Sequence, residues 1–194
     1  MSFIFSDAYT IDASGKTTGD FRARPYSVIS AMTGGQPNPQ QGTFWRRAVM
    51  EKTGMFDDSL HYCMDFDYWI RIALAGFEIR YVPGFRGAYR LHGDSKTVSH
   101  SYKFENEMQM VIEKVYARPD LPANVQAAHA DTQNYLQWRM LKQLYLQNKR
   151  KEALALTERF IKGKRNGRRI LALAIMMDCV LHTSFARALD TLAY

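Results

Sequence analysis

Hydrophobic and polar positions follow two different patterns along the chain. Up to residue 98, short apolar runs alternate with turn residues, as expected for strands and short helices of a sheet-containing domain. From residue 99 onward, apolar residues recur at helical spacing, which predicts helices at 101–117, 123–147, 150–162 and 168–190. We therefore predict an α/β domain over 1–98 and a helical region over 99–194.

The elements of the first part are predicted to be short. Runs of β-forming residues place strands at 3–5, 43–45, 77–82 and 85–92, and helix signals place short helices at 25–33 and 46–54. A hairpin is expected after the first strand, and Pro83-Gly84 predicts a turn between the last two strands. Because the chain starts within a strand that has no earlier partner, we also expect further sequence upstream.

The segment 64–76 predicts the helix around which the first part is organised. Its apolar residues form one stripe that can be buried, namely Phe66, Trp69, Ile70, Ala73 and Leu74. Asp65 and Asp67 lie in its first turn, near unpaired N–H groups and the positive end of the helix dipole. Asp65 is then either a catalytic carboxylate or a helix cap. Asp67, about 200° further round the helix, is expected to complement the dipole or to pair with an arginine.

Composition places the chain among globular proteins, and its charge is unevenly distributed. Of its residues 46% are hydrophobic, and the net charge is +7. Residues 1–116 carry 13 Lys and Arg against 13 Asp and Glu, whereas residues 117–194 carry 13 against 6. The two cysteines match no metal or redox spacing, which favours a reducing compartment. With no signal peptide pattern and no apolar run long enough to span a bilayer, we expect a cytoplasmic location.

The basic helical region has three interpretations. Clusters at 149–152 and 162–169, beside the apolar run 170–177, suit attachment to anionic lipid at the inner face of a membrane. A helical appendage with a solvated basic face is an equally simple reading. A helix-hairpin interaction module is the third, with 135–160 resembling at most one irregular tetratricopeptide repeat. No recognition motif accompanies the charge, so no specific nucleic acid partner is predicted.

Four motifs in a fixed order give the first part a resemblance to a known family. They are Gln41-Gly-Thr-Phe-Trp-Arg-Arg47, Thr53-Gly-Met-Phe-Asp-Asp-Ser-Leu60, Asp65-Phe-Asp-Tyr-Trp-Ile-Arg71 and Tyr89-Arg-Leu-His-Gly-Asp-Ser95. Together they resemble the C-terminal half of family 2 glycosyltransferases. That resemblance implies a partial GT-A fold, with an incomplete Rossmann-like mixed sheet, and transfer of a sugar with inversion from a nucleotide donor. It extends over residues 1–98.

The resemblance also implies roles for particular residues. It makes Asp65 the general base that takes the proton of the acceptor hydroxyl. For His92 it implies a contact to the donor diphosphate. From residue type and position, donor or substrate contacts are also expected from Gln41, in the amide-rich loop 34–42 whose alternative is an ordinary surface loop, and from Arg46, Arg47, Arg90 and Lys96. For Arg46 and Arg47 the alternative is salt bridges to Asp57, Asp58 or Asp65. His92 is in addition a candidate ligand for Mn²⁺ or Mg²⁺, the alternative being a structural histidine.

The chain departs from the family pattern at the donor side. A complete enzyme has an N-terminal nucleotide-binding half that ends in an acidic metal motif, and neither is found here. Asp7 and Asp12 lie in the expected hairpin, and we do not assign them as metal ligands. We therefore expect a truncated fragment that is inactive alone, whose complete form uses a divalent metal, a nucleotide-sugar donor and a polysaccharide, lipid-linked or protein acceptor. The alternative is a non-catalytic helical interaction module or a peripheral membrane module.

Overall fold

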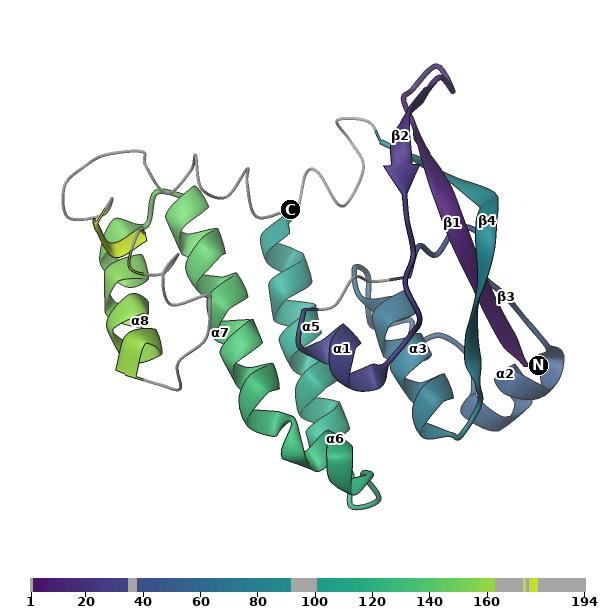
Figure 1. Ribbon diagram of the computed structural model, residues 1–194. Coiled ribbons are helices and arrows are strands. Elements are labelled where there is room, and N and C mark those ends of the chain that lie inside the picture. Colours follow the sequence, from purple (N-terminus) through teal and green to yellow (C-terminus); the bar gives the residue numbers. More distant parts are fainter. Residues whose placement is uncertain (1, 35–37, 92–100, 163–172, 174, 178–194) are drawn as a thin grey trace. The chain divides into compact units, whose positions relative to one another are not determined.

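The computed structural model describes residues 2–34, 38–91, 101–162, 173 and 175–177 of the chain (Figure 1). The chain divides into two compact units, Met1–His129 and Ala130–Tyr194. The division lies later than the predicted boundary at 98/99, so the first helix of the predicted helical region belongs to the first unit. Each unit is described separately below.

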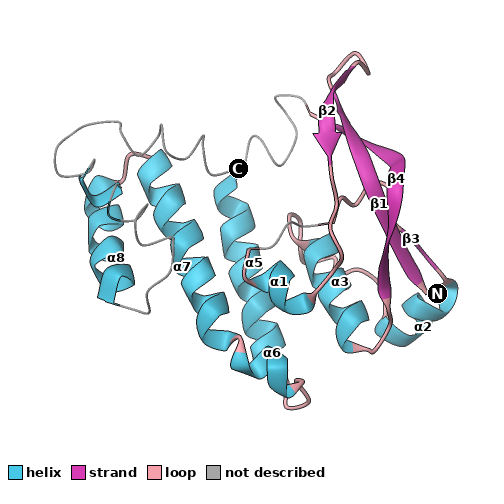
Figure 2. Ribbon diagram, in the orientation of Figure 1, coloured by secondary structure: helices cyan, strands magenta, loops and turns pink. Residues whose placement is uncertain are grey.

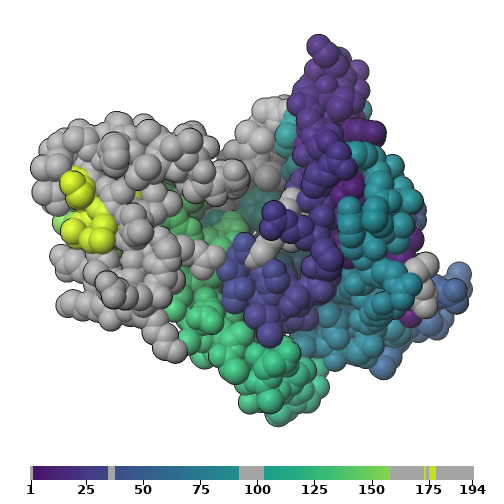
Figure 3. All heavy atoms as spheres, viewed as in Figure 1, coloured from purple at the N-terminus to yellow at the C-terminus, as the bar shows by residue number. Residues whose placement is uncertain are grey.

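A mixed four-stranded sheet forms the centre of the first unit. Strand β1 (Phe3–Ile11) pairs antiparallel with β2 (Thr17–Phe21) and with the short β3 (Phe44–Trp45), and parallel with β4 (Ile79–Arg90). Because β4 follows the whole length of β1, β2 and β3 must share the opposite edge of β1, one at each end. The sheet and its helices confirm the predicted α/β class. The β1–β2 hairpin projects beyond the other elements of this unit (Figure 3).

Strand β4 corrects one prediction. The turn expected at Pro83-Gly84 does not separate two strands, because one strand continues from Ile79 to Arg90. The pairing with β1 instead shifts register on both sides of Asp7, so the irregularity is absorbed as a bulge. At the bulge Gly84 takes a φ of +107° and its N–H donates to Asp7. A proline is tolerated at such a position because it has no N–H to contribute to the ladder.

Helices α2 (Arg47–Thr53) and α3 (Met64–Leu74) pack on the face of the sheet that carries Phe3 and Phe5 (Figure 2). Both end close to where their sequences predicted, at Gly54 and Gly76, which have positive φ angles. Their buried side chains are Val49 on α2 and Tyr68, Trp69 and Ile72 on α3, and these form one core cluster with Phe3 and Phe5. On the opposite face, Ser6 Oγ donates to Gly42 O, so the loop before β3 covers the sheet there.

The remaining helices of the first unit are α1 (Val28–Met32), α5 (Ser101–Tyr116) and α6 (Ala123–Ala127). Helix α1 is shorter than the predicted 25–33, since Ser27 caps it and accepts the N–H of Ser30. The helix predicted over 123–147 is interrupted. Its first part is α6, which ends at Ala127 with Ala128 as its C-cap, and α7 (His129–Leu146) begins directly after Ala128.

The second unit contains a helical hairpin made of α7 and α8 (Arg150–Lys162) (Figure 1). The turn between them places Asn148 at a φ of 60°, a conformation that asparagine tolerates better than most residues. Lys149 N–H then bonds back to Leu144 O and closes the turn. The hairpin has its own buried cluster, formed by Leu141, Tyr145, Ala153 and Ile175. The helix predicted at 168–190 falls largely outside the described residues.

The core of the first unit gives a stability prediction at Tyr68, which is 1% exposed and whose hydroxyl has no partner among the described residues. An unsatisfied buried hydroxyl is costly, whereas the ring is well packed, 4.6 Å from the Phe56 ring. We expect Tyr68→Phe to raise the free energy of unfolding by about 1 kcal/mol, measured by urea denaturation. The matched control is Tyr81→Phe, which removes a hydroxyl that donates to Asp7 and should be destabilising. A loss of stability in both variants would contradict the prediction.

Candidate functional site

The N-terminus of α3 is capped by a side chain from a different helix. Cys63 occupies the N-cap position of α3 and makes no side-chain cap hydrogen bond. Instead the Glu107 carboxylate, on α5, accepts the backbone N–H groups of His61 at 2.9 Å, Tyr62 at 2.6 Å and Cys63 at 2.9 Å. Burial alone would raise the pKa of Glu107, but these three hydrogen bonds hold it below its ordinary value. The residue therefore stays ionised and stabilises the start of α3.

Asp65 takes no part in binding the N–H groups that lead into α3, because Glu107 accepts them. Asp65 is the second residue of α3, and its Oδ1 accepts the neighbouring N–H of Phe66, at 2.8 Å, which is one of the unpaired N–H groups of the first turn. In the described part of the chain it forms no ion pair. Desolvation raises the pKa of Asp65, and no charged side chain contributes to that shift. A half-buried carboxylate with a raised pKa is suited to accepting a proton.

Asp67 has a different role from Asp65, as its position on the helix predicted. It is 7% exposed and pairs with Arg71 four residues later, with 2.7 Å between Oδ2 and Nε. The same guanidinium donates to Thr53 O at 2.7 Å and to Met55 O at 2.9 Å. Arg71 thus joins the end of α2 to α3, and the predicted pairing of Asp67 with an arginine is confirmed.

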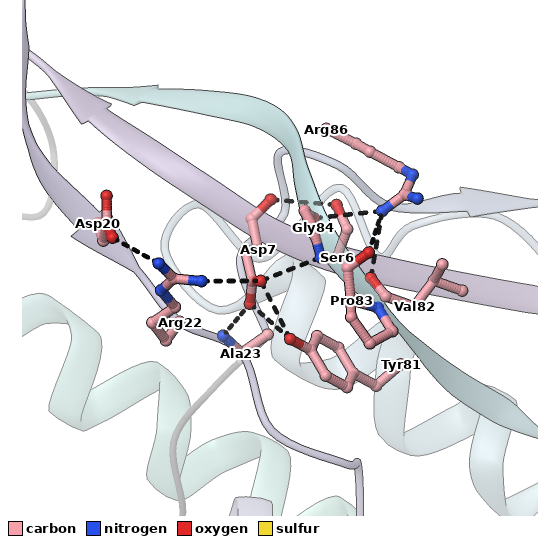
Figure 4. A network of polar contacts seen from close by, with 10 residues as sticks. All are labelled: Ser6, Asp7, Asp20, Arg22, Ala23, Tyr81, Val82, Pro83, Gly84 and Arg86. Atoms are coloured by element: carbon pink, nitrogen blue, oxygen red, sulfur yellow. Dashed lines mark hydrogen bonds and ion pairs between the residues drawn. The ribbon is translucent and has the colours of Figure 1, made fainter.

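Asp7 is the most extensively hydrogen-bonded carboxylate of the sheet (Figure 4). It is 1% exposed and accepts Ala23 N–H at 2.9 Å, Tyr81 Oη–H at 2.9 Å and Gly84 N–H at 3.2 Å. Arg22 lies 3.8 Å from its Oδ2. Desolvation would raise the pKa of Asp7, but the hydrogen bonds and then the Arg22 charge outweigh it and lower the pKa. Donors occupy both carboxylate oxygens, so Asp7 serves to join three segments of the fold.

The described residues do not fit the divalent metal that the resemblance implies. Among them no group of three or more His, Cys, Asp or Glu side chains is placed to hold an ion. The oxygens of Asp7 face N–H and O–H donors, which a cation would have to replace. Asp12 Oδ1 is used in its own turn, by Ser14 and Lys16. His92, the predicted ligand, lies outside the described residues.

The two arginines at the start of α2 are exposed and have no side-chain partner in the part of the chain that the structure describes. Neither Arg46 nor Arg47 forms a hydrogen bond or ion pair through its side chain within the described residues, and both are exposed. The salt bridges that were their alternative role are not seen, because Asp57 binds Lys114 at 2.8 Å instead. Both guanidinium groups are therefore available to an anion in solution.

Two of the other residues predicted to contact the donor are engaged in contacts within the fold. Arg90 Nη1 donates to Asp12 O and Ala13 O, each at 2.9 Å, and so holds the tip of the β1–β2 hairpin. The backbone of Gln41 lies against Gly87. A Cβ atom added to Gly87 would come within 2.6 Å of the carbonyl carbon of Gln41, so only glycine fits there. This contact fixes the loop before β3 on the sheet. Lys96, like His92, lies outside the described residues.

Sequence reasoning missed two features of this site. One is the contact of Glu107 with the residues before α3, and the other is the contact of Arg71 with α2. Glu107 is 44 to 46 residues from the three groups that it binds. No local pattern marks such a contact, and α5 was assigned to the helical region. Arg71 carried a signal, because a basic residue four positions after an acidic one on a helix predicts a pair.

Two further tests concern membrane-spanning helices and similarity to known proteins. Among the described helices, none is both long enough and apolar enough to cross a bilayer. No protein-family model matches the chain, and no curated protein matches its sequence.

Proposed function

We propose that this chain supplies the acceptor side of an inverting sugar transferase, with Asp65 as the general base. The observation that carries the proposal is the state of Asp65 at the start of α3. Glu107, and not Asp65, binds the N–H groups that lead into α3, no cation in the described chain neutralises Asp65, and desolvation raises its pKa. These are the properties that proton transfer at neutral pH requires of a carboxylate.

The proposed reaction assigns one step to Asp65. Its carboxylate takes the proton of an acceptor hydroxyl as that oxygen attacks the anomeric carbon of the donor sugar. The bond from this carbon to the diphosphate breaks, and the nucleoside diphosphate leaves with the electron pair. Attack from the face opposite the leaving group inverts the anomeric centre. A base held at the mouth of a packed helix favours this step because positioning supplies much of the rate.

The unpaired guanidinium groups of Arg46 and Arg47 fit the same proposal. They lie at the start of α2, and Arg71 fastens the other end of α2 to the helix that carries Asp65. Arginine forks recognise phosphate and carboxylate groups, so these two residues are candidate contacts for an anionic part of the donor or acceptor. Attachment of the basic second unit to anionic lipid stays a prediction.

The experiment is an assay for nucleoside diphosphate release. The protein is isolated from its own source through a C-terminal tag, so that any flanking sequence is retained, and is supplied with uridine, guanosine and thymidine diphosphate sugars. Acceptors are a lipid extract and a polysaccharide extract from the same cells. We expect release from at least one donor, and only when an acceptor is present. Absence of release from every donor, together with no calorimetric binding of the three nucleoside diphosphates, would overturn the proposal.

A further inference from the structure

Helix α5 holds the segment that leads into α3 at several points along one face. The contacting residues Phe104, Glu107 and Lys114 recur at intervals of three and seven, which places them along one side of a helix. Val111, between them on that side, is fully buried. The segment 57–63 therefore lies along α5, although α5 is separated from it in sequence by all of α3 and β4.

The contacts differ in what they can control. Lys114 binds Asp57 at 2.8 Å, at the far end of the segment from α3, and holds the pKa of Asp57 at about 2 together with Ser59. Phe104 packs its ring 5.1 Å from the ring of Tyr62. Cys63 Sγ donates to Phe104 O at 3.4 Å. Glu107 binds the three backbone N–H groups that directly precede α3. The contacts of Glu107 and Phe104 with Cys63 lie two residues before Asp65, and the charged, shorter hydrogen bonds are those of Glu107.

We infer that Glu107 is a positioning residue for Asp65, which it holds in place by fixing the three residues that lead into α3. The inference rests on the proposed function for its catalytic meaning, while its structural basis is the three hydrogen bonds. A carboxylate that accepts three successive N–H groups restrains their peptide planes in both direction and distance. Because Asp65 has no side-chain partner of its own in the described chain, its position depends on the helix end that Glu107 fixes.

The test replaces Glu107 with glutamine, whose amide oxygen can still accept a hydrogen bond, so that the chain can fold. Two readouts are measured on the full chain by NMR, namely amide hydrogen exchange at His61, Tyr62 and Cys63 and the titration of the Asp65 carboxyl. Comparison with Asp65→Asn assigns the titrating signal. We expect exchange at the three amides to accelerate about tenfold or more. The Asp65 titration should move down towards the ordinary aspartate range, as a loosened helix end admits water.

The charge-conserving variant Glu107→Asp separates positioning from charge. Loss of the Glu107 charge would by itself lower the pKa of Asp65, because a neighbouring negative charge disfavours ionisation. A fall in the Asp65 titration that also appears in Glu107→Asp, which keeps the charge but shortens the side chain, therefore reports a change in enclosure or geometry. In the enzyme assay the corresponding signature is a fall in kcat, about tenfold to a hundredfold, at an unchanged KM for the nucleotide sugar.

Two matched variants complete the test. Glu113→Gln makes the same chemical change on an exposed position of α5, where the side chain contacts only Gln109. Lys114→Gln loosens α5 at Asp57, away from the helix end. Neither should alter the Asp65 titration. If Lys114→Gln moves it as far as Glu107→Gln does, or if Glu107→Gln leaves it unchanged, the inference is wrong. Should Glu107→Gln fail to fold, Glu107→Asp is measured against the same criteria.

These outcomes are independent of the proposed function. The titration and the exchange rates require no substrate, so Glu107 can be shown to position Asp65 even in a protein that transfers no sugar. Conversely, full turnover by Asp65→Asn would end the catalytic proposal and leave the structural role of Glu107 intact. Normal titration in Glu107→Gln, with turnover abolished by Asp65→Asn, would reject the positioning role alone.

Discussion

Asp65→Asn should lower kcat by about a hundredfold to ten-thousandfold, the usual contribution of a general base. The amide keeps the size of the side chain and its hydrogen bond from Phe66 N–H, but it cannot take a proton. Binding of the nucleoside diphosphate should be unchanged, because the variant alters the proton acceptor and no donor contact. Product formation gives the first quantity and calorimetry gives the second.

The pH dependence adds an independent check on the same residue. Because burial raises the pKa of Asp65, the rate of the wild-type protein should increase with pH through a pKa above the ordinary aspartate value. That limb of the profile should be absent from Asp65→Asn. The control is Asp58→Asn, which changes an exposed carboxylate in the preceding turn. If Asp65→Asn retains full turnover, or if Asp58→Asn loses as much, Asp65 is not the base.

The largest loss of stability is expected for Asp7→Asn, about 3 kcal/mol by urea denaturation. The amide presents N–H groups to Ala23 N–H, Gly84 N–H or the Tyr81 hydroxyl, all of which are donors (Figure 4). Any orientation of the new side chain therefore leaves at least one buried donor facing another donor. The control Asp20→Asn removes only the exposed pair with Arg22, which should cost less than about 1 kcal/mol.

The contribution of Asp7 should depend on pH in a defined direction. Its pKa is lower in the folded chain than the ordinary value of 3.8, so the unfolded chain binds the proton more tightly. The stability that Asp7 adds is therefore complete above pH 3.8 and falls as the pH decreases through the folded pKa. The difference in unfolding free energy between wild type and Asp7→Asn should shrink in the same interval. A difference that stays constant down to pH 2 would show that the charge is not what matters.

Several elements could be predicted from local sequence because their signals are local. Helices α2 and α3 end close to Gly54 and Gly76, where a positive φ angle is needed. The pairing of Asp67 with Arg71 follows from their spacing of four on a helix. By contrast, the continuity of β4 depends on Asp7, a residue of another strand, which accepts the Gly84 N–H and so stabilises a bulge instead of a turn.

The ambiguity at Asp65 shows most clearly what the sequence lacks. A carboxylate in the first turn of a helix is compatible with capping or with catalysis, and nothing in residues 64–76 distinguishes the two. The contact that bears on this choice comes from Glu107, which binds the N–H groups before α3 and lies on a helix that the sequence pattern assigned to a separate region. Such a contact is fixed by tertiary packing, which hydrophobic periodicity does not predict. The partner of Asp57 is likewise fixed by tertiary packing. It is Lys114, although Arg46 and Arg47 are nearer in sequence.

The clamp formed by Arg71 has a consequence for how this sequence can evolve. Its two contacts beyond α3 are with carbonyl oxygens of the main chain, at Thr53 and Met55, which every amino acid possesses. Substitution of the exposed Met55 side chain therefore leaves the clamp intact, so that position is free to drift among lineages. Gly54, with a φ of 78°, lies between the two bound carbonyl groups, so its backbone conformation and the Asp67–Arg71 pair together set the geometry of the clamp.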